Sequence, residues 1–127
     1  MKSMLFVFAA TAAILLPSAA TAQNMNADVY YKRANALMAK GPLALFSRGE
    51  INILMVEAKN AGKAAHDQRI AALKAGKPAR SCPPTKASMD SKEFMARLGA
   101  IPPAERARIN MTEAMTRITI ARFPCPR

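Results

Sequence analysis

Apolar residues along the chain recur three or four positions apart, which is the spacing of a helix with one buried face. The first such segment runs from residue 26 or 27 to residue 40, and Gly41-Pro42 follows it as a stop signal. The second runs from about residue 49 to residue 75 and ends at Gly76. We therefore predict one medium and one long helix, joined by a short turn.

The long helix carries small residues in the middle of its apolar face. Gly62 costs about 1 kcal/mol relative to Ala in a helix interior, so we expect a closely packed neighbour beside it. Ile53 and Val56 lie off this face, which makes the first half of the helix apolar on nearly all sides and predicts its burial. Ser47 and Glu50 have the spacing of a capping box at the helix start. The predicted inner face comprises Ile51, Leu54, Met55, Ala58, Gly62, Ala65, Ala72 and Leu73, interrupted by Arg69.

A loop, a short helix and a helical turn follow in the sequence. Residues 76–88 contain Gly76 and three prolines together with Ser, Thr and Lys, which indicates a loop. Asp90 and Glu93 favour the start of a short helix, and we expect Gly99 to end it. Pro103 is typical of the first position of a further helical turn.

The last segment of the chain combines helix and strand signals. Residues 117–123 contain Ile and Thr, which also suit a strand. We predict a helix, because Ala114 and Ile118 keep helical spacing and no partner strand is evident. Asn110, with Glu113 three residues later, is the expected cap of this helix. The domain is therefore predicted to be all-α, a small bundle of four to five helices.

The first 22 residues have the organisation of a signal peptide. Lys2 gives a positive start, residues 4–16 form an uncharged apolar run, and Pro17 breaks that run. Ala20 and Ala22 are small residues at the positions that a signal peptidase reads. A membrane anchor is the alternative, but it needs about 20 apolar residues to cross the hydrocarbon core. We predict a signal peptide at 1–22, a single helical domain at 23–127, a periplasmic or secreted location and no transmembrane segment after cleavage.

The two cysteines, Cys82 and Cys125, both stand beside prolines. An even number of cysteines in a small exported domain favours a disulfide, and two free buried thiols are the alternative. Pro124 disfavours a helical conformation at Phe123, so Cys125 is expected in an extended tail. A bond between the two would close a loop of about 44 residues and stabilise the fold by about 4 kcal/mol. One disulfide thus completes the predicted fold.

No group of residues in the sequence forms a recognisable catalytic or metal site. His66 is the only histidine, and Asp67 beside it points about 100° away on a helix. We therefore expect His66 at the surface. Neither a nucleophile motif nor a glycine-rich phosphate loop occurs, and the eight acidic residues are scattered along the chain. We predict no catalytic residues, no metal, no cofactor and a protein that is not an enzyme.

The chain is strongly basic, with a formal net charge of +11. Several basic residues fall within about one third of the circumference of the long helix, which favours an acidic protein surface or anionic lipid headgroups as a partner. An ordinary solvated face is the alternative. We predict no nucleic-acid binding, because the strip contains no interleaved aromatic residues and an exported protein seldom meets nucleic acid. The candidate strip comprises Lys59, Lys63, Lys74, Lys77 and Arg80.

The prolines around the two cysteines carry a family resemblance. The run Cys82-Pro83-Pro84, a following helix and a closing helix that ends in Phe123-Pro124-Cys125-Pro126 resemble the small exported immunity proteins that neutralise peptidoglycan amidase effectors of type VI secretion. The resemblance covers Ser47 to Pro126 and rests on scaffold residues. Family members carry an additional cysteine in the region that matches the first half of the long helix, where this chain has none.

Two functions from different classes are compatible with the sequence. The resemblance implies a periplasmic binding protein whose protein partner is a cell-wall hydrolase effector. The alternative is an envelope stress or chaperone-like protein that binds unfolded clients or anionic surfaces. Nine methionines in a small basic chain suit that alternative, because methionine adapts to irregular apolar contacts.

Overall fold

The computed structural model of the protein describes residues 24–127, so the predicted signal peptide at 1–22 lies outside the described residues. The described part is an all-α bundle, and one disulfide joins its central loop to its C-terminal tail, as predicted. In chain order the helices are α1 (Ala27–Ala39), the 3-10 helix η2 (Gly41–Phe46), α2 (Arg48–Lys74), α3 (Ser91–Ala100), α4 (Pro103–Arg106) and α5 (Met111–Arg122).

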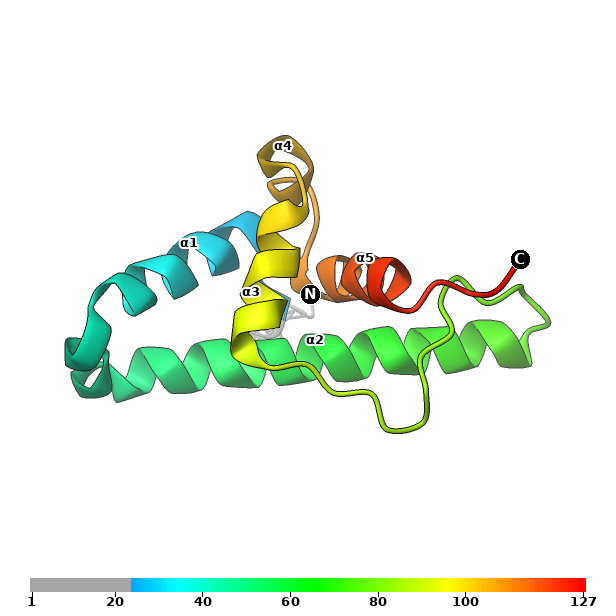
Figure 1. Cartoon of the computed structure of the whole chain (residues 1–127), viewed down its shortest axis with the longest axis horizontal. Coiled ribbons are helices and arrows are strands. Elements are labelled where there is room, and N and C mark those ends of the chain that lie inside the picture. Colours follow the sequence, from blue (N-terminus) through cyan, green and yellow to red (C-terminus); the bar gives the residue numbers. More distant parts are fainter. Residues whose placement is uncertain (1–23) are drawn as a thin grey trace, which may run out of the picture.

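Helix α2 runs along the length of the molecule and supports the other helices (Figure 1). Helix α5 lies beside it, and these two share the most extensive contact between any two helices of the described chain. Helix α1 leads away from the centre to η2, which turns the chain back into α2 at one end of the molecule (Figure 1). The loop after α2 leads to α3, and the C-terminal tail ends near that loop.

The core lies where α1, α3 and α5 meet the middle of α2. Tyr30 links three of these helices: its ring meets the Phe94 ring edge-on with 5.9 Å between centroids, and its hydroxyl donates to the Leu54 carbonyl at 3.1 Å. Burial raises the pKa of Tyr30, and the Glu57 carboxylate adds to this effect. Removing apolar surface from water supplies the main stabilisation. The buried hydrophobic residues are Ala27, Tyr30, Ala34, Leu54, Ala61, Phe94, Leu98, Ile101, Met111, Ala114 and Ile118.

Two of the predicted helix caps are confirmed. The Asp90 side chain accepts a hydrogen bond from the Glu93 backbone N–H at 2.8 Å, and the Asn110 side chain accepts one from the Glu113 N–H at 2.9 Å. Each bond satisfies an N–H that has no partner inside its helix. The chain after Asn110 is helical as far as Arg122, so the prediction of a closing helix is confirmed over the strand alternative.

The capping box predicted from Ser47 and Glu50 does not form, although α2 begins where it was expected. Ser47 makes no side-chain capping bond, and its hydroxyl accepts from Lys40 Nζ at 3.0 Å. Glu50 accepts two hydrogen bonds from the Arg33 guanidinium, at 2.7 and 2.6 Å, and so joins α1 to α2. A bidentate pair between two charged groups is stronger than a bond to a neutral N–H, because both partners are ionised.

Gly99 lies inside α3 and serves close packing, so the prediction that it ends the helix is wrong. A Cβ atom at this position would lie 2.8 Å from the Tyr31 hydroxyl oxygen and 3.2 Å from its ring. The Arg106 guanidinium covers that ring at 3.9 Å from its centroid. The absent side chain of Gly99 therefore makes room for an aromatic ring that Arg106 also contacts.

A largely buried ion pair fixes the one-turn helix α4. Arg106 Nε donates to Asp28 Oδ1 at 3.0 Å, and Arg106 also donates to the Ile101 carbonyl at 3.0 Å. Hydrogen bonds from Lys32 and then from Arg106 lower the pKa of Asp28. A helix of four residues is too short to be stable alone, so this pair between α4 and α1 holds it in place.

The first half of α2 is more exposed than its apolar composition predicts. Met55, from the predicted inner face, is 66% exposed, and Ile53 and Val56 are about half exposed. Helix α1 and η2 contact α2, and much of the first half of α2 meets solvent. The carboxylate of Glu57 is buried and accepts the backbone N–H of Met25. The buried residues of α2 are Leu54, Glu57 and Ala61.

Candidate functional site

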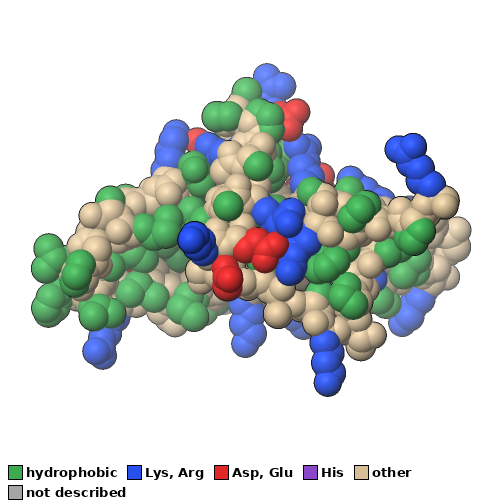
Figure 2. All heavy atoms as spheres, viewed as in Figure 1, with side chains coloured by type: hydrophobic (Ala, Val, Ile, Leu, Met, Phe, Trp, Pro, Cys, Tyr) green, Lys and Arg blue, Asp and Glu red, His purple; other side chains and the backbone are tan. Residues whose placement is uncertain are grey.

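The end of the molecule formed by η2 carries exposed apolar side chains, which we call the apolar tip (Met38, Leu43, Leu45 and Phe46). Phe46 is 88% exposed, Leu45 68%, Leu43 65% and Met38 54%. No residue of η2 is buried. Figure 2 shows hydrophobic side chains gathered over this end of the molecule. An exposed group of large apolar residues is a usual sign of an interaction surface.

Local geometry holds the apolar tip in place. Gly41 has a φ of 56°, a left-handed conformation that glycine adopts without strain, and it redirects the chain after α1. Gly41 is the first residue of η2, and Pro42 is the second. The Arg33–Glu50 pair braces α1 against the start of α2, and its hydrogen bonds lower the pKa of Glu50 and raise that of Arg33. The tip is thus displayed on a braced turn between two helices.

The charges beside the apolar tip suit it to binding another protein. Between residues 38 and 48 the charged residues are Lys40 and Arg48, and no acid occurs. The surface is therefore apolar with a cationic edge, which complements an apolar patch bordered by acidic groups. In many protein interfaces a few centrally buried residues carry most of the binding energy.

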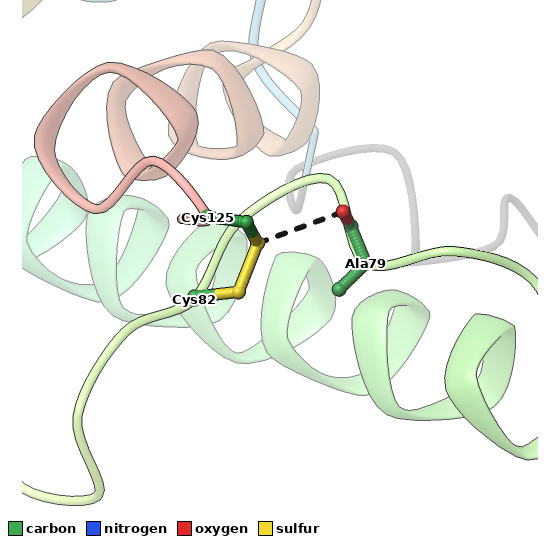
Figure 3. Close-up of a disulfide and its surroundings, with 3 residues drawn as sticks. All are labelled: Ala79, Cys82 and Cys125. Atoms are coloured by element: carbon green, nitrogen blue, oxygen red, sulfur yellow. Dashed lines mark hydrogen bonds between the residues drawn. A yellow bond between two sulfur atoms is a disulfide. The ribbon is translucent and has the colours of Figure 1, made fainter. Parts of the chain in front are cut away.

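The disulfide holds the C-terminal tail against the loop that follows α2 (Figure 3). The Cα atoms of Cys82 and Cys125 are 4.9 Å apart, and the Cys82 N–H donates to the Phe123 carbonyl at 2.7 Å. Cys125 Sγ lies 3.6 Å from the Ala79 carbonyl oxygen. The predicted pairing is confirmed, and the alternative of two free thiols is wrong.

A second feature is a cavity of about 500 Å³ between the second half of α2, the loop after it and the end of α5, which we call the α2–α5 cavity. Its apolar lining includes Ala65 and Ala72 of α2, Met89 of the loop and Met115 of α5. Its titratable side chains are all basic, namely His66, Arg69, Lys77, Arg80 and Arg122.

The five residues of the predicted basic strip fall into two groups, those that line the α2–α5 cavity and those that do not. Lys77 and Arg80 line the α2–α5 cavity. Lys63 pairs with Asp67 at 2.6 Å, but both side chains are exposed, so the pair contributes little. The strip as an interaction surface stays a prediction. The members outside the cavity lining are Lys59, Lys63 and Lys74.

The sequence pattern did not single out two arginines of the cavity or the apolar tip. Arg69 is a charged residue on the predicted apolar face of α2, and this break in the pattern is the signal by which it could have been found. Arg122 lies at the end of α5, where it resembles an ordinary C-terminal basic residue. The signal for the tip is the run of four apolar residues at 43–46, which falls between two helices.

His66 is exposed, and its Nδ1 lies 3.2 Å from a guanidinium nitrogen of Arg69. Asp67 is hydrogen-bonded to Lys63, so the two neighbours do not form a pair. Across residues 24–127, no three His, Cys, Asp or Glu side chains lie close enough together to hold a metal ion. His66 is thus a rim residue of the cavity.

No family model, curated protein or solved structure matches the chain. None of the helices in the described part of the chain is both long enough and apolar enough to cross a bilayer. The apolar tip and the α2–α5 cavity are therefore the two features from which we argue function.

Proposed function

We propose that this chain is an exported, periplasmic helical binding protein whose apolar tip contacts a folded protein partner. The observation that supports this most directly is Phe46, which is 88% exposed next to two leucines that are also mostly exposed. Burying each such side chain in an interface contributes about 1.5–3 kcal/mol. A partner that covers the tip would thus gain most of a specific affinity from a few residues.

A cell-wall hydrolase effector is the partner that we propose. Residues 82–84 and 123–126 support it through their resemblance to the amidase immunity proteins, and the disulfide suits an oxidising compartment such as the periplasm. The net charge of +11 favours a partner with acidic groups around the contact, because long-range attraction speeds association. In this proposal the protein inhibits by occupying the hydrolase and contributes no chemistry of its own.

The test uses the purified, oxidised protein with amidase-type hydrolases encoded near its gene. Calorimetry measures binding, and the clearing of a peptidoglycan suspension measures hydrolysis. The Leu45→Ser/Phe46→Ser variant should weaken binding and inhibition by at least about 100-fold, because two buried anchors are lost. Leu73→Ser is the matched control, since Leu73 is 42% exposed near the opposite end of α2 and should not affect either measurement.

Two results would contradict the proposal. Binding that survives the tip variant would show that the partner contacts another surface. Full hydrolase activity in the presence of equimolar protein would remove the inhibitor function. The second candidate, a chaperone-like or envelope stress protein, would then be favoured if the protein suppresses aggregation of unrelated clients and the tip variant does not.

A further inference from the structure

The floor of the α2–α5 cavity is apolar and unfilled. Gly62, Ala65 and Ala72 bring little side-chain volume to the face of α2 that lines it. These small residues had indicated a closely packed neighbour. However, the nearest group to a Cβ atom at Gly62 would be the Met115 methyl at 3.5 Å, which is an ordinary contact. The space of about 500 Å³ is within the usual range for small-molecule sites.

The rim of the cavity is cationic, and no Asp or Glu lines it. The ion pairs between described residues do not involve Arg69, Lys77 or Arg80. Arg122 differs, because its Nε lies 2.8 Å from Glu93 Oε1. Three basic side chains outside any ion pair surround one apolar space. This arrangement favours a ligand with an anionic group, for which guanidinium is the geometrically best donor.

A buried hydroxyl adds a polar group to the same wall. Ser81 is 5% exposed and lines the cavity. Thr116 and Thr119 also line the cavity, but their hydroxyls donate to the Thr112 and Met115 carbonyls within α5. The Ser81 hydroxyl can both donate and accept a hydrogen bond, so it adds a polar group to the cavity wall.

The walls of the cavity are fixed by contacts that exist without a ligand. The disulfide and the Cys82 N–H bond to the Phe123 carbonyl tie the loop to the tail. The Arg122 guanidinium donates to the Ser88 carbonyl and so ties the loop to α5. Walls that are already ordered lower the entropy cost of binding.

From these observations we infer that the α2–α5 cavity binds a small amphipathic anion, a molecule with a compact apolar body and one sulfonate, carboxylate or phosphate group. The apolar body lies on the floor formed by the alanines of α2 and by Met115. The anionic group is bound at the rim by Arg69 and Arg80. The site is separate from the apolar tip, and its ligand is independent of the proposed protein partner.

The experiment compares two probes that share one ring system. Anilinonaphthalene sulfonate carries the anionic group, and N-phenylnaphthylamine is its uncharged counterpart. Fluorescence titration of the purified, oxidised protein measures both affinities, and backbone amide NMR shifts locate the site. The sulfonate should bind at a single saturable site at least about tenfold more tightly than the neutral probe. Its largest shifts should fall on residues 62–72, 79–89 and 115–123.

Matched variants distinguish binding at the cavity from attraction by the net charge of the protein. Arg69→Gln/Arg80→Gln should weaken binding of the sulfonate by at least about tenfold and leave the neutral probe unchanged. Lys59→Gln/Lys74→Gln removes the same two charges outside the cavity and should leave both affinities unchanged. The tip variant Leu45→Ser/Phe46→Ser should also bind the sulfonate normally.

Three outcomes would overturn the inference. The first is equal affinity for the two probes, which would show that the anionic group is not recognised. The second is that the lysine and the arginine variants weaken sulfonate binding equally, which would show that only the net charge of the protein matters. The third is a set of NMR shifts that map to the apolar tip, because the probe would then bind at the other surface.

Discussion

Removing the disulfide should cost the protein a large share of its stability while leaving its helices folded. The change is Cys82→Ser/Cys125→Ser, which preserves side-chain size closely. The two cysteines are 43 positions apart, so the bond closes a loop of about 44 residues in the unfolded chain. The loop-entropy relation gives about 4 kcal/mol for a loop of this length. Small domains are stable by about 5–15 kcal/mol in total.

The structure indicates why removing the disulfide should lower stability mainly through the unfolded state. Helix α5 is anchored by buried Met111, Ala114 and Ile118, all of which precede the tail that carries Cys125. The Cys82 N–H bond to the Phe123 carbonyl needs no disulfide. The variant should therefore keep the helical content of the native protein, because the contacts between α2 and α5 do not involve the sulfur atoms.

The assay is urea unfolding followed by far-ultraviolet circular dichroism, with thermal unfolding as a second measurement. The free energy of unfolding should fall by about 4 kcal/mol and the midpoint temperature by about 15–20 °C. Wild-type protein treated with a reductant is the control for the substitutions themselves. A loss below about 1 kcal/mol would refute the loop-entropy reasoning. Lost helicity without denaturant would show instead that the bond holds the native helices together.

Two further predictions concern glycines and pH. Gly99→Ala should lower the urea midpoint by the equivalent of about 1–3 kcal/mol, because its Cβ would meet the held ring of Tyr31, whereas Gly62→Ala should raise it by about 0.5–1 kcal/mol. Cationic hydrogen-bond partners lower the pKa of both Asp28 and Glu50 in the folded state. Their contribution is therefore present above the ordinary carboxyl values of 3.8 and 4.5, and it is lost as the pH falls through the lower folded values. Urea midpoints measured across the acid range should fall accordingly. Glu50→Gln should reduce that dependence, and an unchanged profile would contradict the role of its ion pair.

The helices could be predicted because their signals are local. Asp90 and Asn110 cap the helices that follow them through bonds that span three residues, so the sequence contains both partners side by side. The spacing of apolar residues in α5 likewise needs no knowledge of the rest of the fold. The disulfide could be predicted because the chain has two cysteines and its first 22 residues have the sequence pattern of a signal peptide.

The spacing of residues along the sequence could not predict contacts between distant residues. Glu50 leaves its expected cap for Arg33, 17 positions earlier. Arg106 reaches Asp28 across 78 positions, and this pair holds a helix of four residues. For Glu50 the charged partner from another helix provides a stronger interaction than the local cap, whereas Asp28 keeps its local partner Lys32 as well. No spacing rule identifies either distant partner in advance.

The sequence by itself determined where the helices lie, which cysteines pair and that the chain is strongly basic. Each of these depends on neighbouring residues, on composition or on a single possible pairing. Only the tertiary structure decided which apolar residues remain in water and which basic residues share a cavity. The apolar residues of η2 are exposed because the other helices end before reaching them, and Arg69 and Arg80 line one cavity because the loop after α2 returns along that helix. Burial and charge clustering depend on where separate segments stop and turn, and that information is distributed over the whole fold.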